Sequence, residues 1–84
     1  AYKVYYLELS IMSSDLQEKT YRIIGKNVRK YRLQANISQE KLSEILEVNS
    51  KFIGHVERFE RFISLKKLIE IAQYFNVPVK NFFE

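Results

Sequence analysis

Residues 38–58 read SQEKLSEILEVNSKFIGHVER, and this stretch decides the fold. It predicts two short helices, the first beginning after Ser38 and the second after Asn49. Both residue types cap helices, because their side chains accept a hydrogen bond from an otherwise unpaired amide. Residues 47–49 form a tight turn between the two helices. Apolar residues recur at the spacing of an inward-facing side: Leu42, Ile45, Leu46, Ile53 and Val56.

A longer helix is predicted before this pair. It begins at Ser14 or Asp15, where Gln17 or Glu18 completes a capping box, and it runs to about Gln34. Its apolar stripe consists of Tyr21, Ile24, Val28 and Tyr31.

Two further helices are predicted after the pair. Ser64 caps the first of them, which carries Leu65, Leu68, Ile71, Ala72 and Phe75. Pro78 lacks an amide donor and suits the start of a short last helix. The apolar face of that helix consists of Val79, Phe82 and Phe83. The expected fold is therefore all-α, a compact domain of five helices with no sheet in the body of the chain.

Residues 1–12 differ from the rest and leave two alternatives open. Apolar and polar residues alternate from Tyr5 to Ile11 with the period of a strand, whereas Val4, Leu7 and Ile11 would also share a helix face. We predict an N-terminal extension or arm over residues 1–12 and the domain over 13–84. One hypothesis is that Met12 is an original start; the intact mass of the natively expressed protein would test it.

Basic residues crowd into one part of the first long helix, and no acidic residue interrupts them between Lys19 and Arg32. The chain has a net charge of +4, which is the sign expected of a protein that binds nucleic acid. A solvated helix face is the bland alternative. The basic residues are Lys19, Arg22, Lys26, Arg29, Lys30 and Arg32.

The composition argues against several other classes of protein. The chain has no cysteine and one histidine, so it offers no thiolate metal site and little basis for a catalytic centre. It has neither a phosphate-binding loop nor an apolar run near the ~20 residues that span a bilayer. We therefore expect no enzyme, metal, other cofactor, small-molecule substrate or membrane partner, and a cytoplasmic location is compatible with the lack of cysteine.

The helix predicted over residues 50–59 has the two faces that a DNA-recognition helix needs. One face anchors such a helix to its domain, and the other offers side chains to base edges. Ile53 and Val56 lie on the anchoring face, while Ser50, Lys51, Gly54 and His55 lie off it. The helix also follows a short turn from the preceding one, as in a helix-turn-helix motif.

From about Ile24 to Phe83 the sequence resembles the Cro/lambda-repressor (Xre-type) helix-turn-helix family. The resemblance rests on an ordered series at fixed spacing: Ser38-Gln39, Leu42, Leu46, Val48, Ile53, Val56-Glu57-Arg58, Ser64-Leu65, Ile71-Ala72 and Phe75-Asn76-Val77-Pro78. It implies a lambda-repressor-like domain whose partner is double-stranded DNA.

The resemblance also implies roles for individual residues. Contacts with base edges are expected from Ser50, Lys51, Phe52 and His55. Contacts with the DNA backbone are expected from Gln39, Asn49, Arg32 and Lys26. Phe52 would either pack on a thymine methyl group or simply cover the surface. Arg32 and Glu57 match a pair that forms a structural salt bridge between the first and third helices in several family members.

Five positions depart from what the family usually has or from what a helix favours. Glu47 and Phe59 stand where the family usually has glycine, and a left-handed conformation costs a non-glycine residue on the order of 1 kcal/mol. Ile63 replaces a common proline, and Ser43 replaces alanine at a position that needs a small residue. Gly54 weakens its helix by about 1 kcal/mol relative to alanine; it either leaves room for close approach to DNA or reflects drift at an exposed position.

Together these observations predict a sequence-specific DNA-binding transcriptional regulator. The resemblance implies a homodimer on a palindromic operator, and Phe82 and Phe83 are the expected dimer contact. The alternative is a protein-interaction module, such as an antitoxin or a domain that binds partner helices.

Overall fold

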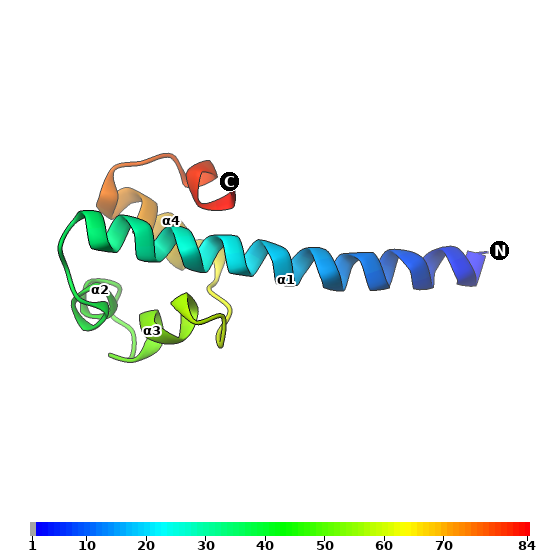
Figure 1. The fold of residues 1–84 in the computed structure, drawn as a ribbon, viewed down its shortest axis with the longest axis horizontal. Helices are drawn as coiled ribbons and strands as arrows, with labels where there is room; N and C mark the ends of the chain where they lie inside the picture. Colours follow the sequence, from blue (N-terminus) through cyan, green and yellow to red (C-terminus); the bar gives the residue numbers. More distant parts are fainter. Residues whose placement is uncertain (1) are drawn as a thin grey trace.

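The computed structural model describes the backbone of residues 2–84 and the side chains of residues 15–84. Its elements are α1 (Tyr2–Gln34), α2 (Gln39–Ile45), α3 (Phe52–Glu57), α4 (Leu65–Phe75) and the 3₁₀-helix η1 (Val79–Phe83). The predicted all-α class is confirmed, with η1 as the last of the expected helices. Figure 1 shows α1 running the length of the view, with α2 and α3 on one side and η1 on the other.

The first helix begins earlier than its sequence predicts. The expected start at Ser14 or Asp15 is wrong, because α1 already contains both residues. Of the two alternatives for residues 1–12, the structure has the helix from Tyr2 onwards and not the strand. How the side chains of residues 1–14 pack lies outside the described residues.

The α-helices of residues 2–84 all end in the same way. Each is followed by a residue in the left-handed conformation: Asn36 (φ 57°), Glu47 (φ 57°), Phe59 (φ 65°) and Asn76 (φ 56°). The next amide then donates to a carbonyl in the last helical turn, for example from Val48 to Ser43 at 3.1 Å. The left-handed conformation expected at Glu47 is confirmed, and Phe59 has a left-handed conformation as well.

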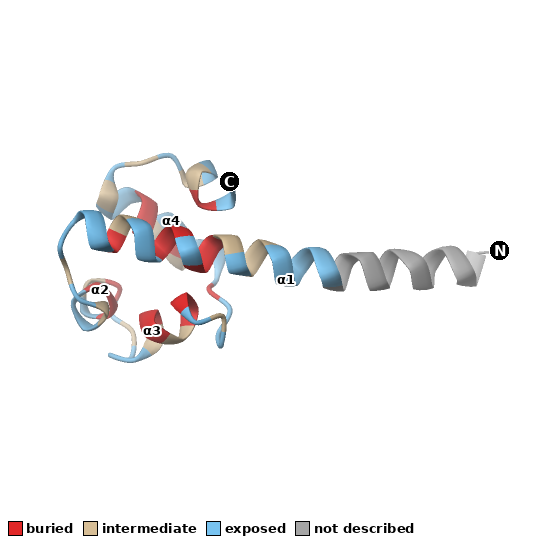
Figure 2. Cartoon of the chain, viewed as in Figure 1, coloured by how far each residue is buried: buried red, intermediate tan, exposed pale blue. Residues whose placement is uncertain are grey.

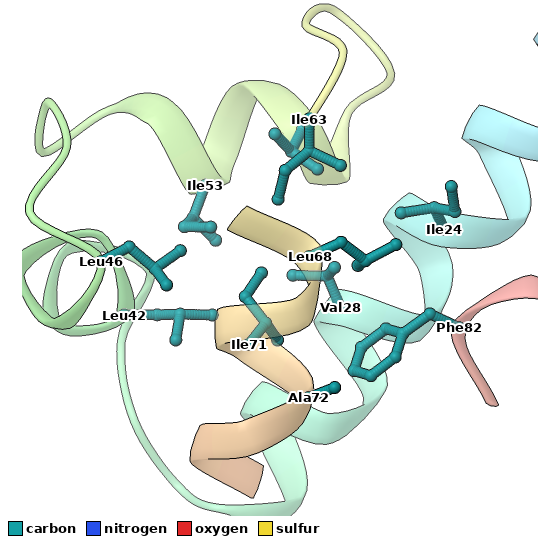
Figure 3. Packing of buried hydrophobic residues seen from close by; sticks show 11 residues of the cluster. Ile24, Val28, Leu42, Leu46, Ile53, Ile63, Leu68, Ile71, Ala72 and Phe82 are labelled. Carbon is teal, nitrogen blue, oxygen red and sulfur yellow. The ribbon is translucent and has the colours of Figure 1, made fainter. Parts of the chain in front are cut away.

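An apolar core joins all four α-helices and η1, and Figure 3 shows how its side chains meet. Figure 2 shows the buried residues on the helix faces that turn toward one another. Ile63, which stands where the family commonly has proline, is 5% exposed and contributes to this core. The core residues are Ile24, Val28, Leu42, Leu46, Ile53, Val56, Ile63, Leu68, Ile71, Ala72 and Phe82.

Phe82 belongs to this core and not to a dimer contact. Its side chain is fully buried, its ring centroid lies 5.0 Å from that of Tyr31, and its carbonyl accepts a hydrogen bond from Asn27 Nδ2 at 3.1 Å. The dimer contact expected at Phe82 is therefore wrong, because the residue is used inside its own chain. Phe83 remains 44% exposed.

Gly25 lets α3 approach α1 closely. A Cβ atom at this position would lie 2.7 Å from the carbonyl oxygen of Val56 and 3.0 Å from the ring of Phe59. Both distances are shorter than packed atoms tolerate, so the missing side chain helps to set where α3 lies on the domain.

Candidate nucleic-acid interface

The start of α3 is fixed by hydrogen bonds from both sides of the preceding turn. Ser43 is fully buried on α2, and its Oγ accepts a hydrogen bond from the amide of Ile53 at 3.2 Å. Asn49 Oδ1 accepts one from the amide of Lys51 at 2.9 Å. The helix expected to begin after Asn49 begins at Phe52, so Lys51 is its N-cap and the cap expected at Asn49 is wrong; Asn49 instead holds the turn before α3. Ser43 does more than supply small size, since it bonds to α3 directly.

The helix predicted over residues 50–59 is shorter in the structure, where α3 runs from Phe52 to Glu57, but it has the two faces that its sequence predicts. Ile53 and Val56 are buried beneath it, while Ser50 and Lys51 are exposed at its start. Phe52 is half-buried against the core, and the guanidinium of Arg61 lies 5.8 Å from its ring. Only part of the Phe52 ring is therefore open to a ligand.

His55 lies in a small cluster of charged groups at the end of α3. Its Nδ1 atom is 2.9 Å from Glu60 Oε1, and Arg58 Nε donates to that same oxygen at 3.0 Å. These two hydrogen bonds, the one from His55 first, lower the pKa of Glu60. The carboxylate is therefore ionised at neutral pH, and it is exposed beside the last turn of α3.

A buried ion pair joins α1 to α3. Arg32 Nε and Nη2 lie 2.7 Å and 3.0 Å from the two carboxylate oxygens of Glu57, and Arg32 Nη1 donates to the carbonyl of Ile37 at 2.9 Å. The hydrogen bond with Glu57 raises the pKa of Arg32, which keeps the guanidinium charged. Because Arg32 is 7% exposed and bonds within the protein, the DNA-backbone contact expected of it is wrong.

Gln39 extends this polar cluster to α2. Its Nε2 atom donates to Glu57 Oε1 at 3.0 Å, and Arg29 Nη1 lies 3.8 Å from the same oxygen. Gly54 makes the contact fit, since a Cβ there would lie 2.9 Å from Gln39 Oε1 and 3.0 Å from Arg58 Nη1. Gly54 is buried, so drift at an exposed position does not explain it; the glycine admits the side chain of Gln39 against α3.

Basic side chains line the edge of α1 beside α3. The guanidinium of Arg22 lies 5.0 Å from the centre of the Phe59 ring, and Arg29 reaches toward Glu57. Lys26 stands between these two arginines at helical spacing and is exposed. This part of the predicted basic stretch therefore flanks the end of α3.

Comparison with known proteins identifies the family of this chain. A helix-turn-helix family model (HTH_3) matches residues 28–82. The chain belongs to the helix-turn-helix family. It is a DNA-binding transcriptional regulator, and the family is one of transcription regulators and not of enzymes.

Two relatives of this helix-turn-helix chain have informative names. Control protein C.SmaI of Serratia marcescens is 46% identical over 57 residues, which make up 68% of this chain and 68% of that protein. An uncharacterized HTH-type transcriptional regulator of Sinorhizobium medicae is 36% identical over 61 residues, or 73% of this chain and 44% of that protein. The chain thus spans less than half the length of the second relative.

Two solved structures share the fold. The restriction-modification controller protein C.AhdI from Aeromonas hydrophila superposes with a TM-score of 0.68 and 25% identity, covering 75% of this chain and 96% of that one. A hypothetical transcription factor from Neisseria has a TM-score of 0.73 over 80% of this chain and 78% of that one. Its identity is 22%, so it supports the helix-turn-helix fold alone.

The structure adds three charged residues to the face that the sequence predicted. Arg58 donates to Glu60 at the end of α3, and the guanidinium of Arg61 lies over Phe52 at its start, although none of the three was an expected DNA contact. A signal for them was present in the sequence. The left-handed residue expected at position 59 turns the chain back across the helix end, which brings the following residues beside its last turn.

Within the described residues, no helix is both long and apolar enough to cross a membrane.

Proposed function

We propose that this chain binds a palindromic operator as a homodimer, with α3 in the major groove. The proposal rests on the two faces of α3. Ile53 and Val56 are buried and anchor the helix in the core, while Ser50 and Lys51 are exposed just before its first turn. Lysine can donate to guanine O6 and N7, and histidine can donate or accept, so Lys51 and His55 are the proposed readers of base edges. The open part of Phe52 would meet a thymine methyl group.

The proposed contacts with the DNA backbone come from Gln39, Asn49 and Lys26. A side-chain amide has two N–H donors. Gln39 can therefore hold Glu57 and a phosphate together, and Asn49 can bind a phosphate while its oxygen accepts from the amide of Lys51. Lys26 would neutralise a phosphate beside the groove, and affinity should fall steeply with salt as such counterion-releasing contacts weaken.

The names of two relatives support a narrower role. One is a control protein and another is a restriction-modification controller protein. We infer that this chain controls the transcription of genes of a restriction–modification system. Since its target is DNA, the cytoplasm is the proposed place of action.

The proposed dimer contact lies where α1, α4 and the end of η1 meet. Leu16, Leu65 and Phe83 are 64%, 60% and 44% exposed, and they line an open hollow of about 420 Å³. A second copy covering this hollow would remove its apolar surface from water, which stabilises association. Two recognition helices in such a dimer would read half-sites about 34 Å apart, or a multiple of that distance.

Selection from a pool of random duplex DNA, followed by sequencing, tests this function. The expected result is a palindromic motif, and Lys51→Gln should change the preferred base at one position of each half-site. Lys66→Gln is the matched control, because it removes the same charge from an exposed position on α4. Failure to retard any duplex at low salt would overturn the proposal and favour a protein-interaction module instead.

A further inference from the structure

The turn after α3 brings Glu60 against His55. Phe59 is left-handed (φ 65°), and the amide of Glu60 donates to the carbonyl of His55 at 2.8 Å. In a helix end of this kind the residue after the left-handed one packs on the last helical turn, and the pair is frequently apolar. Here the pair consists of a carboxylate and an imidazole.

The distances indicate which contact of His55 Nδ1 is the hydrogen bond. Glu60 Oε1 is 2.9 Å from His55 Nδ1, whereas Arg58 Nη2 is 3.5 Å from the same nitrogen. One ring nitrogen cannot donate to the carboxylate and accept from the guanidinium at the same time. The shorter contact, to an ionised group, is the stronger of the two, so Nδ1 carries the proton.

This arrangement determines what His55 offers to a ligand. When Nδ1 of an uncharged ring donates to Glu60, Nε2 on the far side of the ring is an acceptor. An acceptor matches the exocyclic amine of adenine or cytosine in the major groove. The same Glu60 oxygen holds Arg58 Nε at 3.0 Å, which orients that guanidinium beside the imidazole.

Stability alone is a poor explanation for this cluster. The side chains of His55, Arg58 and Glu60 are 39%, 54% and 52% exposed, and exposed ion pairs stabilise a fold by about 0–1 kcal/mol. A carboxylate beside the recognition helix also repels phosphates, which weakens DNA binding in general. The position of Glu60 is explained if its carboxylate orients His55 and Arg58 toward the bases.

We propose that Glu60 is a positioning residue that holds His55 and Arg58 as one unit, so that His55 accepts from an amino-bearing base. The inference rests on the proposed placement of α3 in the major groove. It adds an acidic residue outside α3 to the determinants of operator preference.

Binding selection with Glu60→Ala, Glu60→Gln and His55→Ala tests the inference. Glu60→Ala should lower the preference for adenine or cytosine about tenfold, at the same operator position that His55→Ala affects. Glu60→Gln should keep most of that preference, because its amide oxygen still accepts from Nδ1, and should raise affinity for all sequences. Glu44→Ala, which removes an exposed carboxylate on α2, is the matched control.

The outcomes separate this inference from the proposed function. A wild-type protein that selects a motif, with Glu60→Ala selecting the same motif at uniformly higher affinity, would overturn the inference and leave the proposed function standing. A wild-type protein that selects no motif overturns both.

A second measurement needs no DNA. His55 is the only histidine of the chain, so its ring ¹⁵N signals identify its tautomer directly. At a pH where the ring is uncharged, the wild type should carry the proton on Nδ1, and Glu60→Ala should lose that preference while keeping the fold. A wild-type ring protonated on Nε2 overturns the inference.

Discussion

Glu57 ties α3 to two other helices through the hydrogen bonds of its buried side chain. Its side chain is 2% exposed and accepts hydrogen bonds from Arg32 and Gln39, which lie on two other helices. Glu57→Gln would leave the buried guanidinium of Arg32 without its counter-charge. Removing one partner of a buried pair costs about 3–5 kcal/mol, so the free energy of unfolding should fall by roughly 3 kcal/mol in a urea titration.

A matched substitution separates burial from charge. Glu44→Gln removes the same charge from a side chain that is 74% exposed, and it should change the free energy of unfolding by no more than about 0.5 kcal/mol. Equal losses in the two variants would contradict the role assigned to Glu57.

Single residues were predictable where their role is local or follows from the resemblance. The Arg32 and Glu57 pair and the left-handed Glu47 are of this kind. The roles of Gly54 and Phe82 were not predictable, because their neighbours come from distant parts of the chain. The side chain of Gln39 lies against Gly54, and Asn27 of α1 donates to the carbonyl of Phe82. A pattern along one helix does not show which distant side chain will fill the space beside it.

At the scale of elements, two helix ends with the same backbone should respond in opposite ways to glycine. Glu47 is exposed at the end of α2, so Glu47→Gly relieves a left-handed conformation that costs about 1–2 kcal/mol. The greater freedom of glycine in the unfolded chain offsets about 0.4–1 kcal/mol of this gain. We expect a net stabilisation of about 0.5–1 kcal/mol by thermal or urea unfolding.

Phe59→Gly provides the contrast. The Phe59 ring is half-buried, packs against Gly25 of α1 and lies beneath the guanidinium of Arg22. Losing that contact should outweigh the relief of the backbone, so the variant should be less stable by about 1–2 kcal/mol. Stabilisation by both substitutions would show that backbone strain alone governs these turns.

The elements that were predicted well carry both a cap and an apolar stripe. Ser38 and Ser64 each accept a hydrogen bond from the amide three residues on, so α2 and α4 begin where the sequence indicates. The start of α1 was missed for a physical reason. A cap residue begins a helix only where the residues before it leave helical geometry, and the chain from Tyr2 onwards does not.

At the scale of the whole molecule, the exposed apolar hollow is the surface that two copies would share. Leu65 is the first residue of α4, is 60% exposed and lines this hollow. Leu65→Gln removes apolar surface without adding charge, so the isolated domain should keep its stability. Burying a leucine side chain stabilises association by about 1.5–3 kcal/mol, and a two-fold symmetric contact contains Leu65 from both copies. The dimer dissociation constant should therefore rise at least about tenfold in sedimentation equilibrium.

Leu33→Gln is the matched control for this prediction. Leu33 is 53% exposed near the end of α1 and does not line the hollow, so its substitution should leave the dissociation constant unchanged. The variants also separate association from DNA reading, because Leu65→Gln leaves the recognition face of α3 intact. It should still bind a single half-site while losing preference for the full palindrome. If both leucine variants dimerise as the wild type does, the contact lies on another face of the molecule.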